Sequence, residues 1–237
     1  MKRIYKHRKR IIIQPQVDTP SFRYFCENIS ASFVQAKSVL KNDATSTVWV
    51  TSINNCPVVV KRINPTPLWH QVRRRLTSNR TRYNWQNAKR LRALNIPTFN
   101  PLAMIETWWG PSYTVTSFVE GKNAFQLLSE EPQSWPYYAE QLAQLVLQLH
   151  RFKVRHRDLN PYNLIWCQGR WHVIDLDAMR SYGVSFLSNF YLKRECERLL
   201  DNWQDTFPQH PEFVQILMHT LQKAVYTDLA IRIPSIL

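Results

Sequence analysis

Five carboxylate and amide side chains stand within 20 residues of one another, and this spacing constrains the chain more than any other sequence feature. They belong to Asp158, Asn160, Asn163, Asp175 and Asp177. The stretch begins His156-Arg157-Asp158-Leu159-Asn160-Pro161-Tyr162-Asn163, and Asp175 follows twelve residues later in Val173-Ile174-Asp175-Leu176-Asp177. Residues 171–176 are rich in aromatic and β-branched side chains and predict a short strand between the two polar segments. The polar residues either cap loops or form a cluster with a chemical function, because carboxylate and amide oxygens are ligands that Mg²⁺ prefers.

The predicted elements run in the order strands, helix, strands, then mostly helices. Alternation of apolar and polar residues predicts strands over 46–52 and 57–62, with a turn at Asn54-Asn55, and over 104–108 and 113–119. Apolar spacing predicts helices over residues 68–94, 136–152, 187–203 and 211–227. Residues 1–30 are weakly periodic and are broken by Pro15 and Pro20, so they predict an arm with one short element.

This order predicts an α+β chain in two lobes. The small β-rich N-lobe, with a basic arm, would take residues 1–116, a hinge residues 117–122, and a helical C-lobe residues 123–237. A ligand would lie in the cleft between the lobes, because pockets favour domain interfaces.

The two polar segments resemble the H-R-D-L-x-x-x-N catalytic loop and the D-F-G metal loop of protein-kinase-like phosphotransferases. Upstream, Val58-Val59-Val60-Lys61 resembles the V-A-I-K strand of the same proteins. All three motifs stand in the order of that family, and each falls in the local structure expected for it. The resemblance implies a two-lobed protein-kinase-like fold.

More narrowly, the chain resembles the lipopolysaccharide core heptose/Kdo kinase family over roughly residues 37–205. The segments that carry this resemblance are residues 58–62, 85–103, 156–163, 174–177 and 191–194. The resemblance implies a phosphotransferase that moves the γ-phosphate of ATP, with Mg²⁺, to a sugar hydroxyl. The acceptor would be a heptose or Kdo of the lipid A–core, at the cytoplasmic face of the inner membrane.

The resemblance also implies roles for single residues. Asp158 would accept the proton of the acceptor hydroxyl, and Lys61 would place a positive charge on the α- and β-phosphates. Asn163 and Asp175 would bind Mg²⁺. From its position in the chain alone, the backbone of residues 115–121, which include Glu120, would hold the adenine.

Four neighbouring residues are also considered. For three of them the sequence leaves two roles open, and for the fourth it predicts a structural role. Asn160 either shares the Mg²⁺ or forms a hydrogen bond with Asp158. Asp177 either adds a second metal contact or holds its loop, and Arg157 either supports the structure or binds a phosphate of the acceptor. His156 is expected to brace the catalytic loop.

Two departures from the kinase pattern stand out. The segment Lys41 to Thr47, where a glycine-rich loop would cover the phosphates, contains no glycine. No acidic residue stands between Asp43 and Glu106, so the helix that follows Lys61 lacks the usual Glu partner, and Asn84 or Gln86 would take that position.

Positive charge is concentrated in the first half of the chain. Residues 1–100 hold 19 Lys and Arg against 3 Asp and Glu, whereas residues 101–237 hold 12 against 14. A basic face serves an anionic membrane surface, a phosphorylated ligand or a nucleic acid, or it is only solvated. The family resemblance favours the lipid A–core acceptor and an anionic membrane over nucleic acid, and the oligomeric state stays open.

Other features narrow the function by exclusion. No apolar run approaches the roughly 20 residues of a membrane-spanning helix, so we expect a cytoplasmic protein that is peripheral to the membrane. The four cysteines form no C-x-x-C pair, which disfavours a structural zinc site. Two alternatives to the sugar kinase remain: a kinase for another small molecule or a protein, and a pseudokinase that binds through its basic face.

Overall fold

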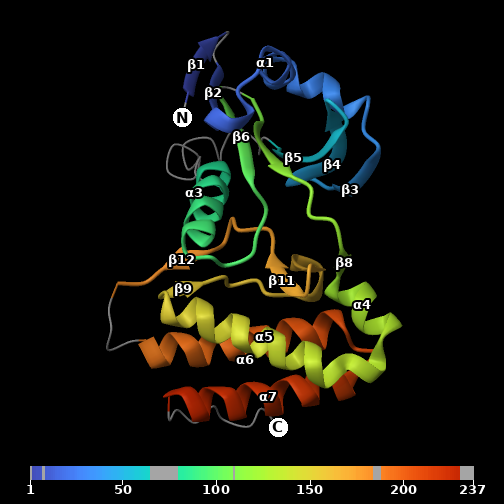
Figure 1. Ribbon diagram of the computed structural model, residues 1–237, viewed down its shortest axis with the longest axis vertical. Helices are drawn as coiled ribbons and strands as arrows, with labels where there is room; N and C mark the ends of the chain where they lie inside the picture. Colours follow the sequence, from blue (N-terminus) through green and yellow to red (C-terminus); the bar gives the residue numbers. More distant parts are fainter. Residues whose placement is uncertain (1, 7–8, 65–79, 109, 184–187, 230–237) are drawn as a thin grey trace. The chain divides into compact units, whose positions relative to one another are not determined.

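The computed structural model describes residues 2–6, 9–64, 80–108, 110–183 and 188–229. The chain forms two compact units. Unit 1 comprises Met1–Arg90 with Phe99–Phe118, and unit 2 comprises Leu91–Thr98 with Val119–Leu237. Unit 1 is built around strands and unit 2 contains most of the helices, which confirms the predicted mixture of a β-rich N-terminal part and a helical C-terminal part (Figure 1). The hinge assigned to residues 117–122 stays a prediction.

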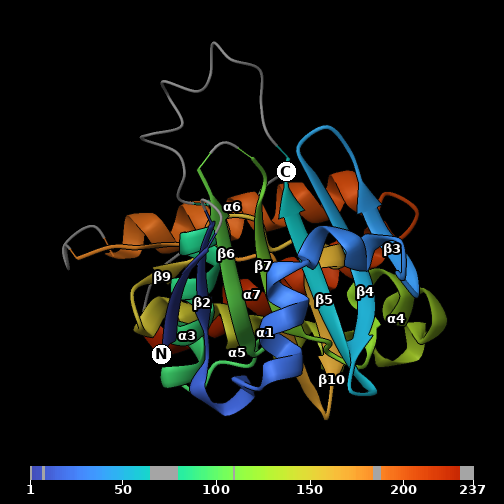
Figure 2. The ribbon, with the colours of Figure 1, turned by 90° about the horizontal axis from the view of Figure 1, so that it is seen from above.

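Unit 1 contains a seven-stranded antiparallel sheet with the order β1-β2-β6-β7-β5-β4-β3, which Figure 2 shows from above. Among the described residues, the sheet is accompanied by the α-helices α1 (Pro20–Glu27) and α3 (Arg80–Ala93) and by short 3-10 helices at Pro15–Val17 and Ile29–Phe33. The strands are β1 (Lys2–Lys6), β2 (Lys9–Ile13), β3 (Ser38–Asn42), β4 (Ser46–Ile53), β5 (Cys56–Ile63), β6 (Pro101–Thr107) and β7 (Ser112–Ser117).

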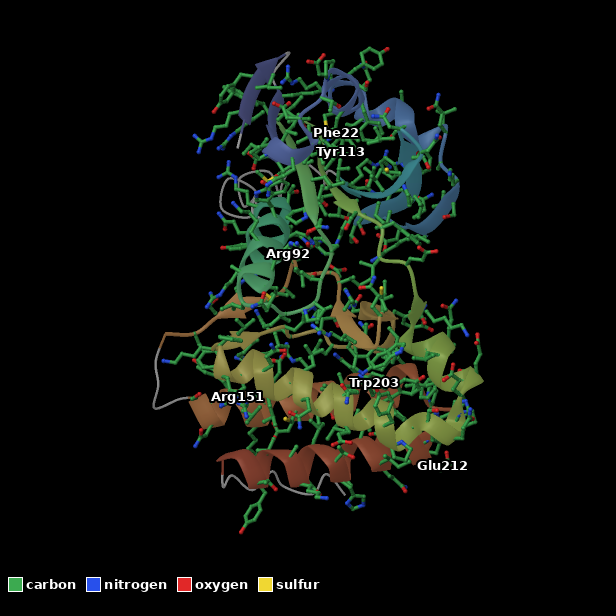
Figure 3. All side chains as sticks on the ribbon, viewed as in Figure 1. Phe22, Arg92, Tyr113, Arg151, Trp203 and Glu212 are labelled. Carbon is green, nitrogen blue, oxygen red and sulfur yellow. The ribbon has the colours of Figure 1, made fainter. Side chains whose placement is uncertain are left out.

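Each face of the sheet is covered by a different helix. The larger buried cluster joins Phe22 and Cys26 of α1 to Val58 and Val60 of β5 and to Tyr113 of β7; Phe22 and Tyr113 are labelled in Figure 3. A smaller cluster on the opposite face joins Trp85 of α3 to Ile12 and Met104. Because side chains alternate between the faces of a strand, Lys61 lies on the α3 face.

The N-terminal residues differ from their prediction. The expected arm is a hairpin, and its second strand, β2, pairs with β6 inside the sheet. Ile11, Ile12 and Ile13 are all buried, since the strand is covered on both faces, and such a strand shows no alternation that periodicity could detect. The predicted short element is α1, where Pro20 is the first residue and the Thr19 hydroxyl accepts the Phe22 N–H at 3.2 Å.

The other predictions for unit 1 differ mainly in their boundaries. The strands predicted over 46–52 and 57–62 are β4 and β5, and Asn54 and Asn55 both have the positive φ of a tight hairpin turn. The helix predicted over 68–94 is described from Arg80 to Ala93, and residues 68–79 lie outside the described residues. The strands predicted over 104–108 and 113–119 are β6 and β7.

In its described residues, unit 2 combines three longer helices with short strands. The helices predicted over 136–152, 187–203 and 211–227 are α5 (Trp135–Arg151), α6 (Ser188–Thr206) and α7 (Pro211–Leu229), and α5 packs against both others (Figure 1). A shorter helix, α4 (Ala124–Glu130), and 3-10 helices at Pro132–Ser134 and Pro161–Asn163 complete the helical part. The strands are β8 (Lys122–Asn123), β9 (Val154–Arg155), β10 (Leu164–Cys167), β11 (Arg170–Val173) and β12 (Arg180–Ser181).

These short strands carry the polar segments of the sequence. Strand β10 pairs with β8 and with β11, and β9 pairs with β12. The strand predicted over 171–176 is wrong at its C-terminal end: β11 stops at Val173, and Asp175 has a φ of 55°, outside the extended region. The polar segments therefore occupy the turns before β10 and after β11.

Candidate active site

Asp158 is the centre of a network of side-chain amides. Asn160 donates from Nδ2 to Asp158 Oδ1 at 3.0 Å, and Asn163 donates from Nδ2 to Asp158 Oδ2 at 3.0 Å. Asn163 Nδ2 also lies 3.0 Å from the Asp158 carbonyl oxygen. Both carboxylate oxygens are thus held by amide donors, so the carboxylate has a fixed orientation.

The local sequence explains why the loop takes this shape. Asn160 has an extended backbone, and its Oδ1 accepts the N–H groups of Tyr162 and Asn163 at 3.0 and 3.1 Å. It caps the 3-10 helix Pro161–Asn163, whose first residue is a proline that needs no hydrogen-bond partner. Of the two roles open for Asn160, the structure shows the hydrogen bond to Asp158.

The segment that contains Asp175 is tied to this loop through backbone groups. Ile174 donates its N–H to the Asn163 carbonyl at 2.9 Å, and His156 Nε2 lies 3.1 Å from the Ile174 carbonyl. Hence the structure brings Asp158, Asn163 and the residue before Asp175 into one hydrogen-bonded unit. Asp177 is buried, and its carbonyl accepts a hydrogen bond from Arg180 at 2.9 Å.

His156 is completely buried beneath the loop. Burial lowers its pKa, although the nearby carboxylates of Glu195, Asp175 and Asp158 act in the opposite direction. A neutral imidazole with its proton on Nε2 donates to Ile174, and Nδ1 has no hydrogen-bond partner among the described residues. The bracing role expected for His156 stays a prediction.

Glu195 of α6 is a site residue that the sequence did not predict. Its Oε1 accepts the Arg157 N–H at 2.6 Å, and its side chain is only 8% exposed. Arg157 has a φ of 72°, which is rare for a residue with a branched or long side chain, and it directly precedes Asp158. The buried carboxylate therefore holds the strained backbone that aims Asp158.

Helix α6 supports the loop at a second point two turns farther along. Trp203 donates from Nε1 to the Leu159 carbonyl at 2.8 Å, and it is fully buried in unit 2 (Figure 3). Glu195 and Trp203 share one face of α6 because they are eight residues apart. The signal was present in the sequence: a charged residue interrupts the apolar stripe formed by Leu192, Cys196, Leu199, Leu200 and Trp203.

Lys61 belongs to unit 1, on strand β5. It is half-buried on β5, paired in register with Val48 and Thr114, on the face that α3 covers. On α3, Asn84 is buried whereas Gln86 is exposed. Of the two amides considered as partners of Lys61, Asn84 is thus the one on the packed side of the helix.

An ion pair connects α3 to the sheet, with the positive charge on the helix. Arg82 donates to both oxygens of Glu106 on β6, at 2.5 and 3.1 Å, and Arg10 of β2 also reaches Glu106 at 3.4 Å. These hydrogen bonds with Glu106 raise the pKa of Arg82. The helix carries the cation and the sheet carries the anion, opposite to the Lys–Glu pair of protein kinases.

The glycine-free segment at Lys41 to Thr47 is a closed turn between β3 and β4. Asp43 Oδ1 accepts the N–H groups of Thr45 and Ser46 at 2.7 and 2.8 Å, and Oδ2 lies 3.0 Å from Lys41 Nζ. These contacts hold the pKa of Asp43 well below its usual range. The turn obtains its shape from a carboxylate that caps it, where a glycine-rich loop relies on conformational freedom.

Glu120 lies exposed in the connecting segment, next to a glycine with a structural role. A Cβ atom on Gly121 would stand 2.1 Å from the Trp166 carbonyl oxygen, so only glycine fits this approach between backbones. Glu120 belongs to unit 2 and Lys61 to unit 1, so these two predicted nucleotide-binding residues lie in different units.

The chemistry of the donor set fits a magnesium ion. Because Asn163 turns its Nδ2 toward Asp158, its Oδ1 is left without a hydrogen bond from any described residue. No cluster of three or more His, Cys, Asp or Glu side chains suited to a metal occurs in the described part of the chain. Mg²⁺ needs fewer protein ligands, since it is commonly held by one or two carboxylates together with phosphates and water.

Two further observations concern the cysteines and the lengths of the helices. Cys26 and Cys196 are buried, and burial raises the pKa of each thiol to about 12, which disfavours the thiolate form. Within residues 2–229, so far as they are described, no helix has both the length and the apolar character required to cross a bilayer.

Comparison with known proteins identifies the family. The model of the lipopolysaccharide kinase (Kdo/WaaP) family matches residues 61–199, a range that begins at Lys61 and includes Asp158, Asn163, Asp175 and Glu195. No curated protein sequence gives a significant match. A solved structure described as WaaP in complex with acyl carrier protein is similar in fold, with a TM-score of 0.57 and 18% sequence identity over 93% of each chain. The match to the family model covers more than half of the sequence, and the chain therefore belongs to the lipopolysaccharide kinase (Kdo/WaaP) family.

Proposed function

We propose that this phosphotransferase uses ATP and Mg²⁺ to phosphorylate a hydroxyl of a heptose or Kdo sugar in the lipopolysaccharide inner core. The observation that carries the proposal is the Asp158 carboxylate, which two asparagine side chains hold in place. Phosphoryl transfer asks a protein mainly for positioning and charge stabilisation, so a carboxylate fixed in advance is the feature such a reaction needs.

Asp158 acts in this proposal as the base for the acceptor hydroxyl. Its two amide partners donate hydrogen bonds that orient the carboxylate, and in this proposal the carboxylate takes the proton of the hydroxyl. Arg157 donates its own N–H to Glu195, which supports a structural role for its backbone, whereas its exposed side chain is available to a phosphate of the acceptor.

The residues proposed to hold Mg²⁺ are Asn163, through its free Oδ1, and Asp175. The ion would neutralise charge on the phosphate oxygens of the nucleotide. Asp177 is buried at the base of the same turn, and we propose that it holds this turn in place. His156 fixes the spacing between the two polar segments through the Ile174 carbonyl.

Lys61 and the connecting segment are proposed to bind the nucleotide. Lys61 stands on a strand paired on both sides, which gives its ammonium group a firm support for pairing with phosphate. Residues 115–121, including Glu120, would offer backbone groups to the adenine. In place of a glutamate, the buried Asn84 would orient Lys61 through its amide.

The acceptor is proposed to be the lipid A–core, reached at an anionic membrane surface. Exposed cations of unit 1 support this proposal, among them Arg3, Arg80, Lys89 and Arg90. Lys and Arg near an anionic leaflet contribute about 1 kcal/mol each to binding, so such a surface would place the enzyme at the cytoplasmic face.

The test is mass spectrometry of purified lipid A–core after incubation with the protein, ATP and Mg²⁺. We expect a gain of ~80 Da, the mass of one phosphoryl group that replaces a hydrogen. Asp158→Asn should lower the rate by roughly 10²- to 10⁴-fold, as loss of a general base does. Asp205→Asn, a matched change on the exposed side of α6, should leave the rate unchanged.

Two outcomes would redirect the proposal. Phosphorylation of a free sugar or a generic protein in preference to lipid A–core would reject the acceptor but keep the kinase. ATP binding without any transfer, equal in the wild type and in Asp158→Asn, would indicate a pseudokinase that acts by binding.

A further inference from the structure

A polar hollow of about 470 Å³ lies in unit 2, and none of its lining residues is one of the candidate active-site residues. One wall is the C-terminal end of α3 with the residues up to Thr98, and the other is the hairpin of β10 and β11. Arg92, which Figure 3 labels on α3, contributes to the first wall, and Arg170 and His172 contribute to the second.

The walls of this hollow are fixed by hydrogen bonds. Thr98 Oγ1 donates to the Val173 carbonyl at 2.6 Å, and Val173 donates its N–H to the Pro97 carbonyl at 3.0 Å. The second wall ends in a two-residue turn in which Gln168 and Gly169 both have positive φ, as tight hairpins require. The hollow therefore exists before any ligand binds, which is typical of small-molecule sites.

The C-terminal end of α3 is capped, and its last carbonyl groups accept hydrogen bonds from the residues that follow. Asn95 has a φ of 55° and donates its N–H to the Arg92 carbonyl at 3.0 Å. Ile96 donates to the Leu91 carbonyl at 2.9 Å, which completes a Schellman motif. The negative end of the helix dipole is thus partly satisfied, which reduces its repulsion of an anion.

The charge of the hollow is positive and uncompensated. Its lining contains two arginines and no acidic residue, and neither Arg92 nor Arg170 forms an ion pair with any described residue. Both guanidinium groups are exposed, yet they come from segments 78 positions apart in the sequence. Burial lowers the pKa of His172, so the imidazole is neutral near pH 7 and the charge comes from the arginines.

We propose that this hollow is a binding site for a small phosphorylated molecule, held between Arg92 and Arg170. Guanidinium groups present paired N–H donors that match phosphate oxygens, and two of them on opposite walls suit a ligand with more than one phosphate oxygen to bind. The amide side chains of Asn95 and Gln168 line the same space and supply neutral donors. Its volume falls within the range of pockets that hold small molecules.

The site is separate from the proposed catalysis. None of its lining residues belongs to the Asp158 network, and Lys61 is in unit 1. The occupancy of the hollow can be measured at its own residues, without following the reaction.

A cysteine in the lining offers a direct test. Cys167 is half-buried in the hollow, Cys56 is exposed in unit 1, and the thiols of Cys26 and Cys196 are buried. The full chain is treated with N-ethylmaleimide, and the rate of modification of each cysteine is followed by peptide mass spectrometry. Pyrophosphate at ten times its half-saturating concentration should slow the modification of Cys167 about tenfold and leave Cys56 unchanged.

Three variants assign the protection to the hollow. Arg92→Gln with Arg170→Gln should abolish it, whereas Arg151→Gln with Arg194→Gln, which removes the same charge from exposed positions elsewhere in unit 2, should keep it. Lys61→Met, which impairs the proposed nucleotide site, should also keep it. Separate arms with ADP, glucose 6-phosphate and inorganic phosphate decide whether the natural source is a nucleotide, a sugar phosphate or the free ion.

The proposal is overturned if ~10 mM pyrophosphate leaves Cys167 unprotected, or if the Arg92/Arg170 variant is protected as well as the wild type. If Cys167 does not react even without ligand, calorimetric titration of pyrophosphate into the wild type and the double variant gives the answer. Equal affinity in the two proteins would reject the site, and loss of binding in the double variant would support it.

Discussion

Glu195 shows how one buried carboxylate can set the geometry of a neighbouring loop. It does not touch the reacting atoms in our proposal, but it accepts the N–H of Arg157 at 2.6 Å, and Arg157 precedes Asp158. Without this acceptor, a backbone with φ of 72° loses the hydrogen bond of its N–H group. Glu195 is therefore a positioning residue for Asp158.

We predict that Glu195→Ala lowers the rate of phosphoryl transfer by roughly 5- to 150-fold, the equivalent of one lost buried hydrogen bond. The KM for ATP should change little, because Lys61 and the connecting segment are unaffected. Glu195→Gln keeps an acceptor oxygen and should recover part of the rate. Steady-state kinetics with the matched surface variant Glu197→Ala check this, and equal losses in both alanine variants would contradict it.

His156 gives the protein a defined response to acid. Its native pKa lies below the ordinary value of about 6.5, because burial opposes the charged form. Between the two pKa values the unfolded chain binds more protons than the native one, so the free energy of unfolding rises with pH in that window. Stability is full above about pH 6.5 and declines as the pH falls toward the native pKa, by at most ~1.4 kcal/mol per pH unit.

The measurement is urea unfolding at several pH values between 5 and 7.5 for the wild type and His156→Gln. We expect the variant to be less stable at pH 7.5 but to lose less stability on acidification. His219→Gln, at an exposed position of α7, should keep the slope of the wild type. If His156→Gln has the same slope as the wild type, the histidine is not the source of the acid sensitivity.

For single residues, the sequence predicts the candidate catalytic side chains better than the side chains that hold them in position. The polar cluster of Asp158, Asn160 and Asn163 stands within six positions, so spacing alone brings the members together. Glu195 stands 37 positions after Asp158, on helix α6, and only tertiary packing places it beneath Arg157. The charged interruption of an apolar stripe was the available signal, but it does not reveal which backbone group the carboxylate meets.

Among the elements, the segment before α4 depends on a close approach between backbones. Strand β8 pairs with β10, and a Cβ atom at Gly121 would meet the Trp166 carbonyl oxygen at 2.1 Å. We predict that Gly121→Ala costs about 2 kcal/mol in stability, or about 4–8 °C in Tm, because the strands must separate.

Gly183→Ala is the matched control for that variant, since a Cβ atom there meets no atom within 4 Å. Differential scanning calorimetry of both proteins should show the loss of Tm only for Gly121→Ala. A Tm of Gly121→Ala within 1 °C of the wild type, at the precision of such a scan, would show that the two strands separate at little cost.

The elements that the sequence predicted well share local signals. The hairpin of β4 and β5 combines alternation with two asparagines that accept positive φ, and the stripe of α5 repeats every three or four residues. Strand β2 was missed because its three isoleucines are buried on both faces and its partner β6 lies about 90 positions away. Strands β3 and β10 are short, and they are stabilised by pairing with other strands. A short stretch of sequence does not show that pairing.

For the whole molecule, only part of the positive charge in the first half of the sequence is available at the surface of the folded protein. Lys9 donates to the Glu27 carbonyl and Arg10 pairs with Glu106, so two cations of the first ten residues are used within unit 1. Arg3 and Lys89 remain exposed. The basic surface available to a partner is therefore smaller than the net charge suggests, although its sign is the same.

We predict that the protein binds vesicles that contain anionic phosphatidylglycerol, and that this binding weakens steeply as salt rises from ~50 to ~500 mM. Arg3→Gln with Lys89→Gln should reduce the partition coefficient at low salt by about 30-fold, from about 1 kcal/mol per cation near the surface. Arg151→Gln with Lys223→Gln removes the same charge from unit 2 and should have a much smaller effect, because the basic surface belongs to unit 1. Vesicle co-sedimentation, with neutral phosphatidylcholine as reference, measures all three proteins. Equal losses in the two double variants would mean that total charge alone attracts the protein, and binding to neutral vesicles that is indifferent to salt would mean that apolar contacts carry it.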